Sequence, residues 1–356
     1  MSTAMPRLLS LATAVPDEIL HQAEVAAAAR TMFDGKLPGF ERLLPVFANA
    51  AIETRRSCMP LEWYQAPHDF TERNRLYVTH AVRLLQRAAT DALTGAGLDA
   101  GEIDLVITVS STGIATPTLD ALLLTRLGLR CDVHRLPVFG LGCAGGVLGL
   151  GRAAAMARSA PASKVLLLVV ELCGLTFRRH DATKSNVVAT ALFGDGAAAA
   201  VVGCAGEGPR LTAWGEHTWP QTLDVMGWQV DNDGLAVVFS RDIPHIVRCD
   251  FGPALARFLA AQGLSLAEIG AFVAHPGGVK VLDALESVFK LPPGGLEIAR
   301  QVLRRYGNMS AATVLFVLQE ELRRRHRAAR PLGRALVSSL GPGFSAAFAL
   351  LEETAA

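Results

Sequence analysis

LPVFGLGCAGGVLGLGRAAAMARS, residues 136–159, contains a short apolar segment, a glycine-rich bend and a run of small, helix-forming residues. We predict a strand, a turn and then a helix whose first residue is Cys143. The start of a helix offers unpaired N–H groups and the positive end of the helix dipole, so a thiol there becomes a nucleophile at neutral pH. The alternative is a buried structural cysteine in a helix packed through glycine and alanine. This stretch alone leaves both interpretations open.

Length, composition and charge exclude several classes of protein. The chain has 356 residues, 51% of them hydrophobic, which is enough for one large domain or two ordinary ones. Its formal net charge is +1, so we expect no nucleic-acid partner and no acidic membrane surface. The six cysteines are scattered, and Cys131 with His134 forms a lone CxxH pair that supplies too few ligands for zinc. We therefore expect reduced thiols, a cytoplasmic protein and no metal site.

The first residues, MSTAMPRLLSLATAVP, allow two interpretations. A weak secretory signal would have one Arg and a short apolar run, and this run is at the lower limit of length for such a signal. We favour a first strand over 7–14 that ends at a proline turn. Apolar runs such as Val165–Val170 are too short to cross a bilayer, so we predict no membrane span.

Hydrophobic periodicity divides the chain into strands and helices. The expected strands are 7–14, 104–110, 164–172, 211–215, 236–240 and 271–278, with a final pair in 334–353 around a Gly-Pro-Gly turn. The expected helices are 22–33, 39–51, 72–96, 119–127, 250–262 and 279–289, with another in 305–322 that begins near Asn308. Segment 191–203 is expected to contain a GDG turn and then a close-packed strand. The basic pair Arg55 and Arg56 can either meet an anionic ligand or lie on a solvated surface.

The two halves of the chain repeat the same order of elements. DLVITVSST resembles AFVAHPGG as a strand with a polar tip, and GCAGGVLGLGRAAAM resembles GNMSAATVLFVLQEE as a helix that opens with one functional residue. We predict a duplicated α/β unit, with an N-terminal half at 1–205, a C-terminal half at 206–356, and helices between or around two sheets. Strand ends and helix starts form the clefts of such folds, and they hold Cys143, His275 and Asn308.

These three residue types suit a carbon–carbon bond-forming acyltransferase. The cysteine would take the acyl group as a thioester, and the histidine would stabilise its thiolate. Histidine and asparagine together would bind the thioester oxygen that becomes negative when a malonyl group loses CO2. On residue types alone, a papain-type Cys-His-Asn hydrolase remains open.

Five motifs in matching order resemble one family. They are GCAGG at 142–146, ALFGDGAA at 191–198, AHPGG at 274–278, YGNMSAA at 306–312 and GPGFS at 341–345. Together they resemble the type III polyketide synthases, the chalcone and stilbene synthase family, over nearly the whole chain. The resemblance implies a thiolase-like five-layered αβαβα fold, a homodimer and a catalytic triad of Cys143, His275 and Asn308. It also implies coenzyme A thioesters, acyl-CoA and malonyl-CoA, as substrates and no metal or organic cofactor.

The resemblance also implies a set of substrate-binding residues. Phe193 and Phe239 match the two phenylalanines between the coenzyme A tunnel and the cavity, and Thr116 stands where a methionine reaches into the partner's cavity. The other expected substrate contacts are Cys173, Thr176, Ser310, Gly277 and Lys280. The tract IETRRSCMPLEWY is similar to bacterial members that take long fatty acyl starters and make alkylpyrones or alkylresorcinols. The coenzyme A phosphate contacts are not clearly matched, although Arg42, Arg241 and Lys280 align near the tunnel mouth.

The expected function is therefore iterative decarboxylative condensation of malonyl-CoA units onto an acyl-CoA starter, followed by cyclisation to a pyrone or resorcinol. The alternative is a ketoacyl synthase III that performs one condensation in fatty-acid synthesis. Those enzymes typically have His-Gln-Ala-Asn where this chain has His275-Pro276-Gly277-Gly278, and they lack the GPGFS form. A non-enzymatic binding module is disfavoured because all three catalytic residue types are present.

Overall fold

The computed structural model describes residues 4–354, and nine of their strands form one hydrogen-bonded sheet. Its order is β11-β12-β13-β8-β1-β7-β6-β4-β5. The strands are β1 (Arg7–Ala14), β4 (Leu105–Val109), β5 (His134–Val138), β6 (Lys164–Leu172), β7 (Asp195–Gly203), β8 (Arg210–Thr218), β11 (Ala271–Ala274), β12 (Gly333–Gly341) and β13 (Ser345–Glu353). Strand β1 lies at the middle of this order, so the strand interpretation of residues 7–14 is confirmed.

The sheet consists of two halves with the same pairing pattern. In the N-terminal half β4 is parallel to β6, β6 is antiparallel to β7, and β7 is antiparallel to β1. In the C-terminal half β11 is parallel to β12, β12 is antiparallel to β13, and β13 is antiparallel to β8. The two halves join through a single registered residue pair, Arg7 with Arg210, between β1 and β8. The repeated pairing agrees with the duplication that the sequence predicts.

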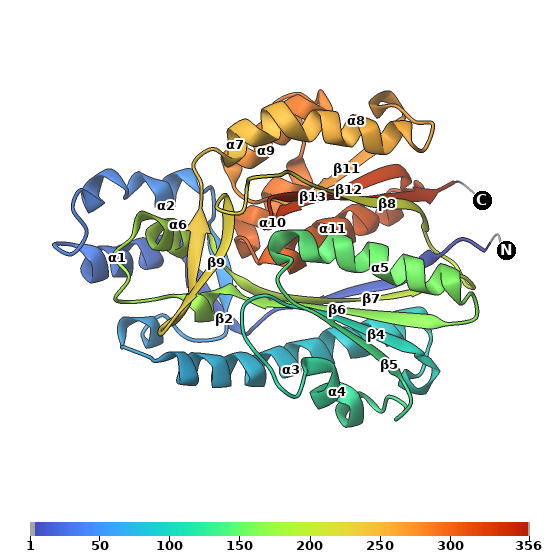
Figure 1. Cartoon of the computed structure of the whole chain (residues 1–356), viewed down its shortest axis with the longest axis horizontal. Coiled ribbons are helices and arrows are strands. Elements are labelled where there is room, and N and C mark those ends of the chain that lie inside the picture. Colours follow the sequence, from blue (N-terminus) through green and yellow to red (C-terminus); the bar gives the residue numbers. More distant parts are fainter. Residues whose placement is uncertain (1–3, 355–356) are drawn as a thin grey trace.

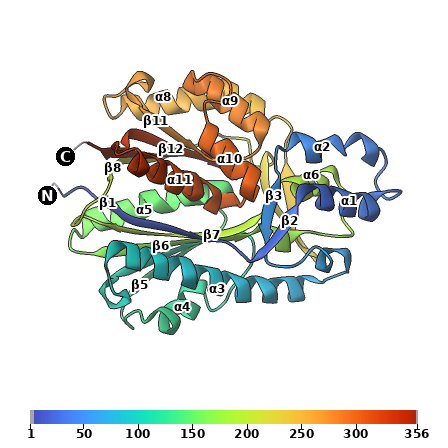
Figure 2. The same cartoon turned by 180° about the vertical axis from the view of Figure 1, so that it is seen from behind.

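Helices cover both halves and fill the space between them (Figure 1). Helices α5 (Gly145–Ser159) and α11 (Thr313–Arg327) run between the two halves of the sheet, while α3 (Phe70–Ala96) and α4 (Leu119–Leu127) cover the outer face of the N-terminal half. Helices α8 (Gly252–Ala260) and α9 (Val279–Phe289) cover the other outer face, and Figure 2 shows the same layers from behind. The result is the predicted αβαβα arrangement of five layers.

Small residues allow the two central helices to approach closely. A Cβ atom on Gly146 would overlap the carbonyl oxygen of Ala311, and one on Gly145 would lie 3.2 Å from the Ala311 side chain. The facing strand β7 contains the run AAAA at 197–200, and all four of these residues are fully buried. Helices and sheet therefore pack with little side-chain volume between them.

A smaller lobe lies at one end of these layers (Figure 1). It contains α1 (Gln22–Phe33), α2 (Pro45–Asn49) and α6 (Lys184–Leu192), together with the β2–β3 and β9–β10 ribbons. The ribbon strands are β2 (Glu18–His21), β3 (Thr54–Ser57), β9 (Met226–Asp231) and β10 (Gly234–Phe239). Leu20, Phe33, Phe47 and Tyr64 belong to the hydrophobic cluster that holds this lobe together.

Three local predictions were wrong. The helix expected over 39–51 is a 3-10 turn (Phe40–Arg42) followed by the short helix α2, because Pro45 can start a helix but cannot lie inside one. The GDG expected as a turn instead leads directly into β7 from Asp195 onward. Asn308 does not begin a helix; it follows α10 (Glu297–Tyr306) and precedes a 3-10 turn (Ser310–Ala312) that continues into α11.

A second group of elements differs in extent. Strand β9 and helix α10 were not predicted, and the expected helix 250–262 is preceded by the short helix α7 (Ile243–Ile246) and a π-helical turn (Val247–Phe251). Among residues 4–354, no helix has both the length and the apolar character needed to cross a membrane.

Substitution of Gly146 by Ala should separate α5 from α11, because the added methyl group meets a backbone carbonyl that cannot move away by a rotamer change. We expect the free energy of unfolding to fall by about 2–3 kcal/mol, the upper part of the range for overpacked cores. Chemical denaturation measures this loss. Gly151→Ala in the same helix is the control, because its Cβ would contact only the Trp214 side chain, at 3.1 Å and beyond. That variant should stay within about 1 kcal/mol of wild type, and equal losses in both variants would contradict the packing argument.

Candidate active site

Cys143 lies in a 3-10 turn, Gly142–Ala144, which leads directly into α5. The prediction of a helix beginning at Cys143 is thus correct in place, although the first turn is tighter than an α-helix. Gly142 has φ +47°, and a Cβ there would lie 2.6 Å from the Pro342 ring. A Cβ on Gly341 would lie 2.7 Å from that of Ala144. The GPGFS and GCAGG motifs therefore pack against each other, and the glycines make this approach possible.

Burial controls the ionisation of the Cys143 thiol. The residue is only 8% exposed, and its Sγ lies 3.5 Å from the Ser310 hydroxyl oxygen. Burial raises the pKa of Cys143 to about 11, although hydrogen bonds from Ser310 and Asn308 oppose that rise. The sequence analysis expected a thiolate stabilised by the helix start. In the unliganded chain, desolvation outweighs that stabilisation, and the resting group is a thiol.

His275 follows strand β11, and its backbone N–H donates to the Ser338 carbonyl at 2.9 Å. Its imidazole is buried, and neither ring nitrogen has a hydrogen-bond partner among the described residues. Burial lowers the pKa of His275 to about 3, so the ring is neutral at pH 7. A neutral ring has one nitrogen that accepts a proton and one that donates, and both are available for a substrate.

The backbone and side chain of Asn308 are both held in place. Its N–H donates to the Leu192 carbonyl at 2.8 Å, and its carbonyl accepts from the Gly194 N–H at 3.0 Å. Its side-chain Oδ1 accepts from the Ser310 N–H at 2.8 Å. Because Oδ1 is engaged by a donor, the amide NH2 is the end that remains to donate to another group.

One cavity of about 510 Å³ brings these three side chains together. Cys143, His275 and Asn308 all line it, although they come from three distant parts of the chain. The expected substrate contacts Phe239, Gly277 and Lys280 line the same cavity, as do Arg42 and Arg241. The last two and Lys280 are exposed, so three cations stand where the cavity meets solvent.

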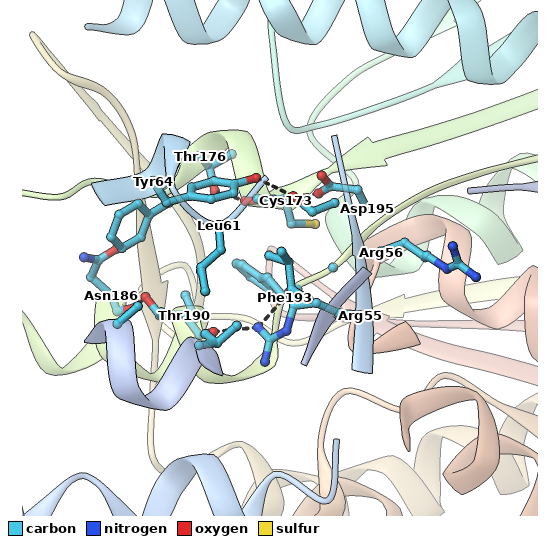
Figure 3. Close-up of a pocket in the computed structure, with 18 of the residues that line it drawn as sticks. Arg55, Arg56, Leu61, Tyr64, Cys173, Thr176, Asn186, Thr190, Phe193 and Asp195 are labelled. Carbon is cyan, nitrogen blue, oxygen red and sulfur yellow. Dashed lines mark hydrogen bonds between the residues drawn. The ribbon is translucent and has the colours of Figure 1, made fainter. Parts of the chain in front are cut away.

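A second, mainly apolar pocket includes Phe193, Cys173 and Leu61 in its lining (Figure 3). Thr176 also lines it, with further apolar side chains such as Met32. The ring of Phe193 packs edge-on against that of Phe239, with centroids 5.7 Å apart. Because Phe239 lines the first cavity and Phe193 the second, this pair stands between the two spaces.

Thr116 does not line either of these spaces. It is exposed in the loop after β4 and precedes a cis peptide bond to Pro117. Ile114 and Phe139, which are 48% and 59% exposed, line a surface cavity of about 470 Å³ beside this loop. Among the residues described, no group of three or more His, Cys, Asp or Glu side chains is placed to hold a metal ion.

Glu171 is a buried charged group that the sequence analysis missed. Its Oε2 accepts from the Ser111 N–H and the Thr112 hydroxyl, both at 2.9 Å, whereas Oε1 has no partner among residues 4–354. Burial raises the pKa of Glu171 to about 7, and its negative charge in turn raises the pKa of Cys143. The signal was the glutamate in VLLLVVEL, because a charge inside a fully buried strand needs polar partners.

Fold and site together are those of a thiolase-type acyl-transferring enzyme. Models of the chalcone and stilbene synthases match the chain, the N-terminal domain over residues 2–206 and the C-terminal domain over 211–353. The chain belongs to this family, and it is a type III polyketide synthase, an acyltransferase that condenses malonyl-CoA units. Membership of this family decides against the ketoacyl synthase III alternative.

Individual relatives agree with this assignment. The 1,3,6,8-tetrahydroxynaphthalene synthase of Streptomyces peucetius subsp. caesius is 42% identical, over 88% of this chain and 85% of the relative. The alpha-pyrone synthesis polyketide synthase-like Pks18 of Mycobacterium tuberculosis is 30% identical, over 96% of this chain and 89% of the relative. The crystal structure of 1,3,6,8-tetrahydroxynaphthalene synthase from Streptomyces coelicolor A3(2) superposes with a TM-score of 0.90 and 28% identity, over 98% of this chain and all of that one. This match confirms the thiolase-like fold.

The elevated pKa of Glu171 predicts a pH-dependent stability. The folded state favours the protonated carboxyl, so this group's contribution is fully present below about pH 4.5 and is lost as the pH rises to about 7. Glu171→Gln removes the titration and keeps an acceptor for Ser111 and Thr112. We expect the stability of this variant relative to wild type to increase by roughly 3 kcal/mol between pH 4.5 and pH 8. Denaturant melts at both pH values measure the difference.

The comparison with the variant is necessary because burial also raises the pKa of Asp195, to about 6, and this group titrates in the same direction. A difference in stability that does not change with pH would show that folding does not raise the pKa of Glu171 above its value in the unfolded chain.

Proposed function

We propose that Cys143 takes the starter acyl group from coenzyme A as a thioester. The thiol proton passes to the neutral imidazole of His275, which lines the same cavity. The thiolate sulfur then attacks the acyl carbonyl carbon, and the coenzyme A thiolate leaves with that proton as the free thiol. The supporting observation is the convergence of Cys143, His275 and Asn308 on one cavity.

The condensation step uses the remaining donors. The malonyl thioester carbonyl would accept hydrogen bonds from the His275 ring N–H and the Asn308 amide NH2. Loss of CO2 leaves its electron pair as an enolate on that oxygen. The enolate carbon attacks the acyl-Cys143 carbonyl, and the cysteine leaves as thiolate. The Cys143 thiolate then attacks the thioester carbonyl of the extended chain, and coenzyme A leaves as a thiolate that takes a proton from water. Another cycle follows, and ring closure ends the reaction.

We propose a long acyl-CoA starter and an alkylpyrone or alkylresorcinol product. The pocket beyond Phe193 is lined mainly by apolar side chains, which suits an alkyl chain, and at about 60 Å³ it would have to widen to take a long one. The cations Arg42, Arg241 and Lys280 at the solvent end of the first cavity suit the phosphates of coenzyme A. The 30% identical relative whose name refers to alpha-pyrone synthesis supports the same product class.

A second candidate product is 1,3,6,8-tetrahydroxynaphthalene, because a synthase of that compound is 42% identical. Its ten ring carbons correspond to five two-carbon units, so malonyl-CoA alone would suffice as substrate. The two candidates therefore differ in whether a separate starter is required.

Incubation with malonyl-CoA and a series of acyl-CoA starters, from acetyl through palmitoyl to aromatic, tests the proposal. Mass spectrometry should find cyclised products whose mass follows the starter, with a preference for long alkyl chains. Cys143→Ala should lower their formation at least a thousandfold, because it removes the acyl acceptor. A product from malonyl-CoA alone would support the naphthalene synthase instead, and free fatty acids as the only products would contradict both.

We also propose a homodimer formed around the exposed Ile114 and Phe139. Large apolar side chains that line a surface cavity are costly to leave in water. An interface there would place the Thr116 loop against a second chain, as the family resemblance implies. The cytoplasmic location and the division at residue 205 remain predictions from the sequence.

Phe139→Asp should weaken this dimer at least tenfold, because it would bury a charge at the interface. Light scattering after gel filtration should find twice the chain mass of 37.7 kDa for wild type and a lower mass for the variant at the same concentration. Leu223→Asp is the control, since Leu223 is 83% exposed away from this surface cavity and its variant should remain dimeric. A monomeric wild type, or a dimer that both substitutions leave intact, would refute the interface.

A further inference from the structure

Arg55 is not on a solvated surface, and its hydrogen bonds go to backbone carbonyls and an amide rather than to an anion, although the Asp195 carboxylate is close enough to oppose the lowering of its pKa by burial. It lies on β3, is only 4% exposed, and turns its guanidinium toward the end of helix α6. One terminal nitrogen donates to the carbonyls of Thr190 at 2.6 Å and Phe193 at 3.0 Å. The other donates to the Ala191 carbonyl at 2.9 Å and to the side-chain oxygen of Gln22. Figure 3 shows Arg55 below Phe193, with its guanidinium close to Thr190.

The end of α6 needs such partners. The last carbonyls of a helix have no intrahelical donors, and their partial negative charge favours a cation. Gln22 adds to the arrangement, because its amide nitrogen donates to the carbonyls of Ala191 and Phe47, each at 3.0 Å. Although burial lowers the pKa of Arg55 to about 10, the guanidinium remains charged at neutral pH. Arg55 and Gln22, hereafter the clamp, therefore hold three backbone carbonyls at the end of α6, those of residues 190, 191 and 193.

The segment that the clamp holds has two functional neighbours. Phe193 follows the last residue of α6, and its ring separates the two cavities. The Asn308 backbone makes two hydrogen bonds, to the Leu192 carbonyl at 2.8 Å and from the Gly194 N–H at 3.0 Å. Together they form an isolated parallel β-bridge between Phe193 and Asn308, the only such bridge outside the named strands of residues 4–354. A Cβ on Gly194 would overlap the carbonyl oxygen of Tyr306, so the two segments touch without spare room.

We propose that Arg55 is a positioning residue for the condensation step. Its hydrogen bonds fix the carbonyls of residues 190, 191 and 193. The backbone of this segment in turn binds the backbone of Asn308 and carries the Phe193 ring. Arg55 acts through Asn308, and this inference therefore rests on the role proposed above for that amide. Cys143 is held from another side, by the Pro342 turn and α5, so its acylation depends less on the clamp.

Two half-reactions distinguish positioning from general stability. The first is acylation of Cys143 by a single acyl-CoA, followed by the mass of the intact protein. The second is decarboxylation of malonyl-CoA, followed by CO2 release. Arg55→Lys keeps the charge but loses the planar set of donors, so it should slow decarboxylation at least tenfold and acylation less than threefold. Gln22→Met removes only the supporting acceptor and donor. It should lower the ratio of the decarboxylation rate to the acylation rate by about threefold.

Arg73→Lys is the matched control. Arg73 is 3% exposed and also donates to backbone carbonyls, those of Phe177 at 3.1 Å and Asp233 at 2.5 Å, but it makes no hydrogen bond to residues 190–194. Its replacement should leave the ratio of the two rates unchanged, whatever it costs in stability. Thermal melts show whether each variant folds. If Arg55→Lys does not fold, the ratio of the two rates in Gln22→Met tests the positioning role.

The two proposals can fail separately. A wild-type enzyme that is acylated at Cys143 but does not decarboxylate malonyl-CoA would refute the proposed function. A wild type active in both half-reactions, with a ratio that Arg55→Lys and Gln22→Met leave unchanged, would refute the clamp alone.

Discussion

The contact between helix α5 and the 3-10 turn that leads into α11 leaves no room for a single methyl group at Gly146. This constraint places the start of α5 beside the turn that precedes α11, and so brings the Cys143 sulfur within 3.5 Å of the Ser310 hydroxyl oxygen. The two halves of the sheet share little else, because β1 and β8 join through one residue pair. The active site is thus assembled across the central helix layer, where the duplicated halves meet.

Burial has a cost at this site as well as a use. Both ring nitrogens of His275 and one oxygen of Glu171 lack partners among the described residues, and each such buried group costs roughly 1–3 kcal/mol. The surrounding core of the five layers offsets these costs. In return, the unpaired ring nitrogens belong to a residue that lines the cavity, and their burial strengthens any hydrogen bond they make to a substrate oxygen.

Much of the fold could be predicted because its signals are local. The strand over 164–172 and the helices over 22–33 and 279–289 match the structure residue for residue, since continuous apolar runs and regular periodicity define them. Helix α10 was missed although its buried residues Ala299, Val302 and Leu303 recur at helical spacing, opposite its charged side. The raised pKa of Cys143 and the orientation of Arg55 could not be predicted, because both depend on neighbours that lie more than a hundred residues away in the chain.

The outermost strand of the N-terminal half, β5, is an edge strand, and one side of its backbone has no neighbouring strand in the chain. Its sequence HRLPV limits the hydrogen bonds that this side can offer. The N–H of His134 donates to Asp104 and the carbonyl of Val138 accepts from Ser110, so the alternate residues Arg135 and Pro137 direct their backbone groups outward. Proline has no N–H, and Arg135 brings a charge that is paired with Asp120 at 3.0 Å. A strand from another molecule would find an incomplete ladder there. The second chain of the proposed dimer, which would lie against Phe139 directly after β5, therefore meets a strand edge with one backbone donor missing.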